Sequence, residues 1–265
     1  MYVIKSDGIR EEFQSRKIIR TCMRSGASRE IAEEIATIIS RNIRDGDTTH
    51  KIYKMIVSEL AKREDRTSFV FRLRESIARM DSLSFELYIK KVLESYGYRC
   101  SWNRIIKGRY VEHQVDMVAE KDKKLYLVEC KHHTNHHRFC GLGNVLAVQA
   151  RLEDVTDGFR NNNNKYNFYI AWVVTNTKFS DHAKRYAKGR SIRLTGWRSK
   201  EFSLENMAEE NKIFPITILK TDISLHKKLL RREIITLQDL MTKEIIGISK
   251  NKIYKLRNQA EKLLR

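Results

Sequence analysis

Apolar positions along the chain change their spacing twice, which divides the chain into three segments. In residues 1–80, a β-prone run at residues 2–5 precedes a turn signal, and apolar residues then recur three or four positions apart, as on one face of an α-helix. Ser28 and either Thr48 or Thr49 stand just before such runs, where N-cap residues are expected. This segment is predicted to be a small, mostly helical domain with a short β-hairpin.

Residues 81–219 have a different pattern, in which strand-like and helix-like runs alternate. A helical run over residues 85–96 comes first and ends at Gly97. The runs that follow are strand-like at residues 115–119, 125–130 and 166–175, and helix-like at residues 145–152 and 181–187. Such alternation predicts an α/β domain with a mixed central sheet flanked by helices.

Helical spacing returns in residues 220–265, with breaks at residues 234–236 and 247–249. Lys and Arg exceed Asp and Glu by more here, for the length, than in the rest of the chain. We therefore expect a basic helical segment after the α/β domain.

The composition points to a polyanionic partner. The 265 residues carry a formal net charge of +19, which favours nucleic acid over other acidic partners. The four cysteines fit reduced thiols in a cytosol, no secretory segment is recognised, and no apolar run is long enough to span a bilayer. The expectation is a cytoplasmic protein that has no membrane partner.

The residues with the clearest chemistry are Asp116, Glu129 and Lys131. In a strand over residues 125–131, Glu129 and Lys131 point to the same face and Cys130 to the other. A hairpin turn near residues 122–124 can bring Asp116 across from Glu129. Two close carboxylates repel each other, and a bound Mg²⁺ or Mn²⁺ relieves that repulsion. Such an ion can activate water, while the lysine stabilises charge on a phosphate.

Two other interpretations of this region stay open. Asp116, Glu129 and Lys131 could form an ion-pair ladder on the surface of a sheet. The histidines that follow could bind zinc with Cys130 and Cys140. A polar loop at the mouth of the site is the stronger interpretation, because consecutive histidines on an extended segment face opposite ways. The histidines concerned are His132, His133, His136 and His137.

The ordered set of motifs over residues 82–219 resembles the PD-(D/E)xK nuclease superfamily, and within it the Mrr-type restriction endonucleases and archaeal Holliday-junction resolvases. The motifs are Phe85-Glu86, Tyr96-Gly97-Tyr98, Val115-Asp116-Met117-Val118-Ala119, Tyr126-Leu127-Val128-Glu129-Cys130-Lys131 and Val173-Val174-Thr175-Asn176. The resemblance implies a restriction-endonuclease-like α/β fold. It also implies that Asp116 and Glu129 bind the metal and that Lys131 is the catalytic lysine. Glu86 and Gln149 match further site residues of the family.

The N-terminal segment resembles an ATP cone, a nucleotide-sensing domain. The matching residues are Val3-Ile4-Lys5-Ser6-Asp7-Gly8, Glu12-Phe13 and Lys17-Ile18. The resemblance implies that Lys5, Gly8 and Lys17 contact the phosphates of ATP or dATP. The alternative is a degenerate cone kept for packing or dimerisation. No GxxxxGK[ST] motif occurs, so nucleotide-driven translocation is not indicated.

The C-terminal segment resembles a helix-hairpin-helix region, with Gly247-Ile248-Ser249-Lys250 at the hairpin. Such hairpins present backbone amides at a helix N-terminus to a DNA phosphate. Lys250, Lys252 and Lys255 would add non-specific attraction to DNA. The alternative is a helical cap with a solvated basic face.

Together these patterns predict a metal-dependent DNA endonuclease whose N-terminal domain responds to nucleotide. The predicted domains are residues 1–80, 81–219 and 220–265. The resemblance also implies a homodimer, since nucleases of this fold often act as dimers to cut both strands of a duplex. Two alternatives remain: a nucleotide-responsive DNA-binding regulator with an inactive nuclease fold, and an RNA-processing nuclease.

Overall fold

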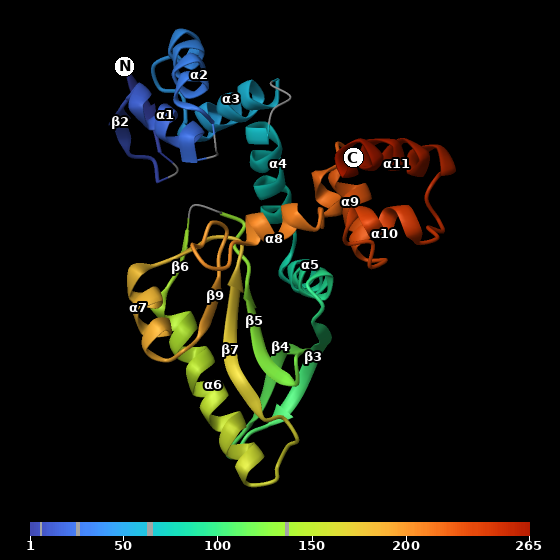
Figure 1. Cartoon of the computed structure of the whole chain (residues 1–265). Helices are drawn as coiled ribbons and strands as arrows, with labels where there is room; N and C mark the ends of the chain where they lie inside the picture. The colour runs from blue at the N-terminus through green and yellow to red at the C-terminus, as the bar shows by residue number, and fades with distance from the viewer. Residues whose placement is uncertain (6, 25–26, 63–65, 136–137) are drawn as a thin grey trace. The chain divides into compact units, whose positions relative to one another are not determined.

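A computed structural model of the chain contains two compact units, Met1–Leu73 and Arg74–Arg265, which are described separately below (Figure 1). Ser6, His136 and His137, which the sequence motifs include, lie outside the described residues. The described residues are 1–5, 7–24, 27–62, 66–135 and 138–265.

The first unit joins a short hairpin to a group of helices. Strands β1 (Tyr2–Ile4) and β2 (Arg10–Glu12) pair antiparallel. The helices are α1 (Ser15–Arg24), α2 (Arg29–Asn42), α3 (Thr49–Ala61) and α4 (Arg66–Ala78), the last of which continues into the second unit. Ser28 and Thr48 accept hydrogen bonds from backbone N–H groups three residues later, which confirms the predicted helix starts.

The second unit is built on a five-stranded mixed sheet in the order β3-β4-β5-β7-β9. Strands β3, β4 and β5 are antiparallel, while β7 and β9 continue parallel to β5. The bounds are β3 (Arg99–Lys107), β4 (Glu112–Lys121), β5 (Lys124–Lys131), β7 (Phe168–Thr175) and β9 (Arg193–Thr195). The predicted α/β fold with a mixed sheet is thus confirmed, and β3 and β9 are the strands of this sheet that the pattern missed.

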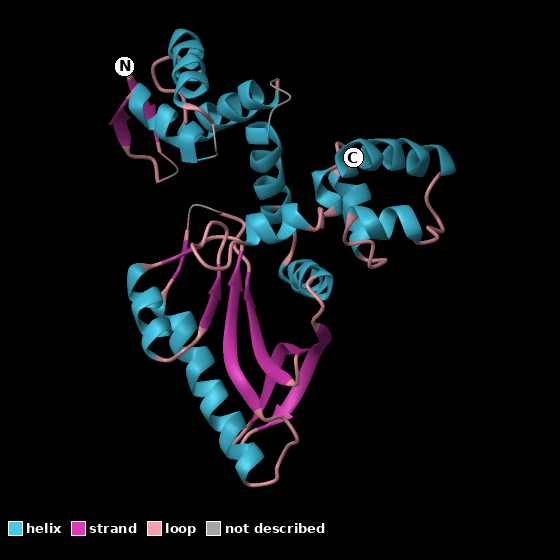
Figure 2. Ribbon diagram, in the orientation of Figure 1, coloured by secondary structure: helices cyan, strands magenta, loops and turns pink. Residues whose placement is uncertain are grey.

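Helices cover the sheet from two sides (Figure 2). Helix α5 (Ser82–Ser95) packs on β3, β4 and β5, with Phe85, Tyr88 and Ile89 buried. Helices α6 (Leu142–Arg160) and α7 (Asp181–Gly189) cover the other side, where valines and alanines pack against the odd-numbered residues of β5 and β7. A small parallel pair, β6 (Phe139–Cys140) and β8 (Lys178–Phe179), completes this side.

The hairpin of β3 and β4 is tied to helix α6. Asp154 of α6 accepts hydrogen bonds from the backbone of Tyr110 and pairs with His113 at 2.8 Å. Glycine is required where helix α6 meets the end of β3, because a Cβ on Gly158 would lie 2.7 Å from the carbonyl carbon of Gly108. This attachment fixes β4 relative to α6.

Short helices follow the sheet and end the chain. Asp239 of α10 forms an ion pair with Lys91 of α5 at 3.1 Å and a capping box with Thr236. The C-terminal helices therefore pack within the second unit. No described helix is long and apolar enough to cross a membrane. The elements are α8 (Leu204–Glu210), the 3-10 helix η1 (Ile216–Ile218), α9 (Ile223–Leu230), α10 (Leu237–Thr242) and α11 (Lys250–Leu264).

Candidate active site

Asp116 lies where strands β4 and β5 separate. Their register ends at Met117 opposite Val128, one step before Asp116 would face Glu129. On its other side, β3 also skips the pair of Asn103 and Asp116, and Asn103 has a positive φ of 51°. The carboxylate of Asp116 accepts the Cys130 backbone N–H at 2.7 Å. The local irregularity thus places Asp116 against residues 129 and 130, as the hairpin argument predicted.

Glu129 is buried at the end of β5 and bridges two cationic side chains. Lys131 Nζ donates to Glu129 Oε1 at 2.7 Å, so the two residues share a face, as the strand pattern predicted. Arg151 of α6 donates to Glu129 Oε2. Two cations on one carboxylate hold it in a fixed orientation.

Arg151 is the residue of this cluster that the sequence analysis missed. It follows Val148 by three residues and precedes Val155 by four, and both valines are buried in the core. An arginine on the core-facing side of a helix needs an acidic partner, because unpaired arginine is almost never buried. The core-facing position of Arg151 between two buried valines was therefore the sequence signal for this contact.

Glu86 reaches the cluster from α5. Its Oε2 accepts the Trp102 indole N–H at 2.9 Å. Burial raises the pKa of Glu86, and the charge of Glu129 adds to this, while Trp102 and Lys131 oppose it. The structure therefore brings Glu86 within electrostatic reach of Glu129 and Lys131.

The site holds more negative charge than its surroundings can neutralise. Burial, followed by the charge of Glu129, raises the pKa of Asp116 to about 6. Burial by itself lowers the pKa of Lys131. The hydrogen bond to Glu129 and the charge of Glu129 raise it by more, so the pKa of Lys131 lies above its usual value. Lys131 is thus cationic at neutral pH beside two carboxylates. Oxygen donors in this state suit a hard divalent cation.

Gln149 does not contact the other predicted site residues in the described part of the chain. Its amide donates to Glu153 at 2.8 Å, and its Oε1 atom is buried with no hydrogen-bond partner among the described residues. Two residues turn an α-helix by about 200°, so Gln149 and Arg151 lie on different flanks of α6. The described contacts do not join Gln149 to Asp116 or Glu129.

The histidine run after β5 is partly built into the fold. His132 Nε2 lies 3.1 Å from the Ile77 carbonyl, and its ring packs against Phe85. Burial lowers the pKa of His132 and of His133. In the described part of the chain, no three His, Cys, Asp or Glu side chains are arranged to hold a metal ion. The zinc interpretation therefore gains no support here.

The lysines predicted to bind nucleotide meet on one carboxylate in the first unit. Lys5 Nζ lies 3.0 Å from Glu11 Oε2, and Lys17 pairs with Glu11 Oε1. Gly8 has a φ of 81° and donates its N–H to the Lys5 carbonyl, which forms the turn. The structure thus brings Lys5 and Lys17 together on Glu11, with Gly8 in the turn that follows Lys5.

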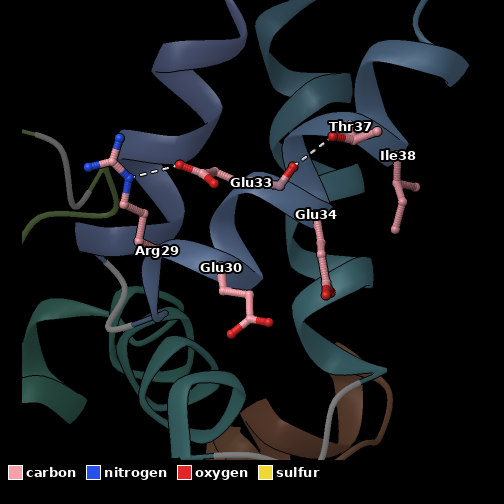
Figure 3. Close-up of a pocket in the computed structure, with 6 residues that line it drawn as sticks. All are labelled: Arg29, Glu30, Glu33, Glu34, Thr37 and Ile38. Atoms are coloured by element: carbon pink, nitrogen blue, oxygen red, sulfur yellow. Dashed lines mark hydrogen bonds and ion pairs between the residues drawn. The ribbon is translucent and has the colours of Figure 1, made fainter.

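A depression of about 730 Å³ along α2 has the wrong charge for phosphate (Figure 3). Arg29 is already paired with Glu33 at 2.8 Å, and two further glutamates line the depression. Its lining residues are Arg29, Glu30, Glu33, Glu34, Thr37 and Ile38. A second depression, of about 400 Å³, adjoins the end of the β1–β2 hairpin and is lined by residues 12–16 and Ser40.

The predicted DNA-contacting lysines lie on the last helix. Lys250, Lys252 and Lys255 are exposed on α11, which begins after Ser249. Gly247 in the preceding loop has a φ of 73°. Arg257 instead points inward and donates to the carbonyls of Leu240 and Lys243, both at 3.0 Å. The three lysines are therefore exposed, with Lys252 and Lys255 on one side of the helix and Lys250 on another, at its first turn.

Comparison with known families agrees with this architecture. The restriction endonuclease model of the Mrr catalytic type matches residues 77–202, and the ATP cone domain model matches residues 1–74. The chain therefore belongs to the Mrr-type restriction endonuclease family and carries an N-terminal ATP cone domain. The predicted resemblances to a Mrr-type nuclease and to an ATP cone are confirmed.

The names of individual similar proteins state no activity. An uncharacterized protein of Archaeoglobus fulgidus is 34% identical over 180 residues, which make up 66% of this chain and 98% of the relative. Another uncharacterized protein of that organism is 54% identical over 39 residues, 15% of this chain and 83% of the relative. The crystal structure of a protein of unknown function, AF1548, is 32% identical with a TM-score of 0.60, covering 69% of this chain and 98% of that one.

Proposed function

We propose that this protein is a metal-dependent DNA endonuclease, with Asp116 and Glu129 as metal ligands and Lys131 as the catalytic lysine. The observation that carries the proposal is the meeting of these three side chains at the end of β5 in a restriction endonuclease fold. The net charge of +19 supports a polyanionic substrate.

The donor set fits Mg²⁺ or Mn²⁺. Asp116 and Glu129 are hard oxygen donors. Burial, and after it the charge of Glu129, raises the pKa of Asp116, and a divalent cation would offset both effects. Such an ion, when bound, supplies an activated water and polarises the phosphate. Metal binding would compete with Lys131 or Arg151 for the oxygens of Glu129.

Each side chain then has a role that its contacts support. Lys131, kept cationic by Glu129, can stabilise the charge that develops on a phosphate oxygen. Arg151 holds Glu129 in orientation, and Glu86 borders the site from α5. Gln149 remains a predicted site residue, and its role would require its buried Oε1 atom to find a partner when substrate is bound.

The flanking parts would regulate and anchor the nuclease. Lys5, Gly8 and Lys17 would contact the phosphates of ATP or dATP, and the three lysines of α11 would contact the DNA backbone. The division into residues 1–80, 81–219 and 220–265 belongs to this proposal, as do the homodimer and the cytoplasmic location.

The direct test is plasmid cleavage with Mg²⁺ or Mn²⁺, with and without ATP. We expect Lys131→Ala to lower the cleavage rate at least about 100-fold, because a donor to the developing charge is removed. Lys188→Ala changes an exposed lysine on α7 and should cleave like the wild type. Digesting RNA of the same sequence alongside would decide between DNA and RNA substrates.

One observation favours the regulator as a second candidate. Both carboxylate oxygens of Glu129 are already paired with the side chains of Lys131 and Arg151. Among the described residues, no three carboxylate, histidine or cysteine side chains are arranged as metal ligands. A regulator would bind DNA without cutting plasmid, junction or flap substrates under any condition. Its DNA affinity would also be unaltered by Asp116→Ala in metal-containing buffer.

A further inference from the structure

A group of aromatic side chains lies on the side of the sheet that faces away from α6 and α7. Its ring centroids are 5.4 to 6.3 Å apart, in tilted and edge-to-face contacts. We call this group the aromatic face. It consists of Tyr98, Tyr126, Tyr169, Trp172 and Phe202.

A break in the strand register brings Tyr169 into this group. Leu125 pairs with Phe168, but Tyr126 pairs with Ile170, so Tyr169 is the extra residue of a bulge. Bulges change the direction of a side chain and often occur beside functional sites. The ring of Tyr169, at this bulge, lies 6.0 Å from that of Tyr126.

The aromatic face has an inner and an outer layer. Tyr126 and Trp172 are buried, whereas Tyr169 is 56% exposed and Phe202 is 37% exposed. The inner rings fill the space above the sheet, and the outer rings offer apolar surface to the solvent. Packing accounts for the inner layer but leaves the exposure of the outer layer unexplained.

Three cations accompany the rings. The guanidinium of Arg193 lies 4.7 to 4.9 Å from the ring centroids of Tyr126, Trp172 and Phe202. Lys124 lies 4.5 Å from the ring of Tyr169, and Lys121 lies 5.2 Å from that of Tyr98. Within the described residues, no carboxylate is at ion-pair distance from Arg193, Lys121 or Lys124. Lys121 donates to the Tyr96 carbonyl at 2.7 Å and Arg193 to the Tyr98 hydroxyl at 3.2 Å. Both acceptors are uncharged, so these contacts leave the positive charge of this face to attract an anionic ligand.

We propose that the aromatic face binds single-stranded DNA, with unpaired bases stacked on Tyr169 and Phe202 and phosphates attracted by Lys121, Lys124 and Arg193. Stacking on aromatic rings beside a basic groove is how proteins bind single strands without sequence preference. A duplex hides the faces of its bases, so this site would select DNA with an unpaired segment. The inference rests on the proposed action on DNA and narrows its substrate class.

Charge argues for DNA over a second copy of the chain. A symmetric dimer through this face would bring the three cations of one copy close to those of the other. The whole chain already carries a net charge of +19, so that contact is unfavourable. A polyanion instead gains from each of the three cations.

The test measures binding without cleavage, using the full chain in EDTA. The probes are fluorescein-labelled oligothymidylate of about 20 nucleotides, long enough for one such site, and an abasic strand of equal length. We expect Tyr169→Ala with Phe202→Ala to weaken oligothymidylate binding at least about tenfold, since each stacked base contributes about that much. Binding of the abasic strand should change less than about twofold, because its phosphates remain.

Control variants separate stacking from folding. Tyr169→Phe with Phe202→Tyr keeps both rings and should bind oligothymidylate as the wild type does. Ile105→Ala with Tyr110→Ala removes apolar side chains elsewhere that are more exposed than Tyr169 and Phe202, and it should have no effect. Equal losses on both strands, no loss on oligothymidylate, or a change of oligomeric state in light scattering would each overturn the proposal. Plasmid cleavage by the same variants reports separately on the nuclease function.

Discussion

The two units of this protein contain the same small arrangement in different surroundings. In the second unit, Glu129 bridges Lys131 and Arg151, and in the first, Glu11 bridges Lys5 and Lys17. The side chain of Glu129 is 5% exposed and that of Glu11 is 25% exposed. Both of the lysines around Glu11 are well exposed.

Burial changes what such a bridge can do. A buried carboxylate must keep its partners, because removing one leaves an uncompensated charge away from water. An exposed pair contributes little, because water and salt replace either partner at small cost. The bridge at Glu129 therefore fixes the geometry of a site, while the bridge at Glu11 can exchange its carboxylate for another anion.

The largest difference should appear on removing an arginine from the buried bridge. We expect Arg151→Ala to lower the free energy of unfolding by about 3 kcal/mol, because Glu129 keeps only one cation. Denaturant unfolding at pH 7.5 measures this. Arg160→Ala, on the same helix, breaks an exposed pair with Asp157 and should cost less than about 0.5 kcal/mol. Equal losses for the two variants would mean that burial does not distinguish the bridges.

The second prediction concerns the excess negative charge at the buried bridge. The pKa of Asp116 is about 6 in the folded protein, against roughly 4 in an unfolded chain. The folded state thus holds this proton more tightly, and stability decreases as the pH rises from about 4 to 6. Asp116→Asn removes the charge and keeps an acceptor for Cys130. It should raise the unfolding free energy by about 3 kcal/mol at pH 8, the equivalent of roughly two pKa units.

The pH gives this prediction an internal control. At pH 4, Asp116 is already protonated in the folded protein, so Asp116→Asn should leave stability nearly unchanged there. A loss of stability at pH 8 would mean that the charge of Asp116 is well compensated in the metal-free protein. Added Mg²⁺ should stabilise the wild type more than the variant, if the ion binds as proposed.

Sequence patterns predicted much of the site because they act over short distances. Alternation along β5 placed Glu129 and Lys131 together, and a two-residue turn at Asp122 and Lys123, both with positive φ, brought Asp116 back to them. Ser28 and Thr48 could be predicted as helix N-caps for the same reason, since an N-cap hydroxyl accepts a hydrogen bond from the backbone three residues later.

Features that depend on distant partners were not predicted. Strand β3 alternates poorly, because most of its side chains are exposed. The role of Arg151 depends on its contact with Glu129, which lies 22 residues earlier in the chain. The orientation of Asp116 depends on the interrupted pairing of β4 with both neighbouring strands, β3 and β5. The bulge at Tyr169 likewise follows from the register of β5 against β7, which no local pattern contains.

The smallest expected effect concerns the exposed bridge. In the first unit, a nucleotide phosphate must displace Glu11 before it can reach Lys5 and Lys17. Glu11→Gln removes that competitor and should raise ATP affinity about two- to fivefold, the range that an exposed ion pair of up to about 1 kcal/mol allows. Isothermal titration of the full chain with ATP and dATP measures it, and unfolding free energy should change by less than about 1 kcal/mol.

A neighbouring residue supplies the matched control. Glu12 is exposed on the same strand and pairs with neither lysine in the described contacts, so Glu12→Gln should alter ATP affinity only through the long-range charge, which salt screens. Glu12→Gln should therefore approach the wild-type affinity at physiological salt, while Glu11→Gln should still bind ATP more tightly. Weaker ATP binding by Glu11→Gln would show that Glu11 positions the lysines. The exposed bridge would then act like the buried one, despite its contact with water.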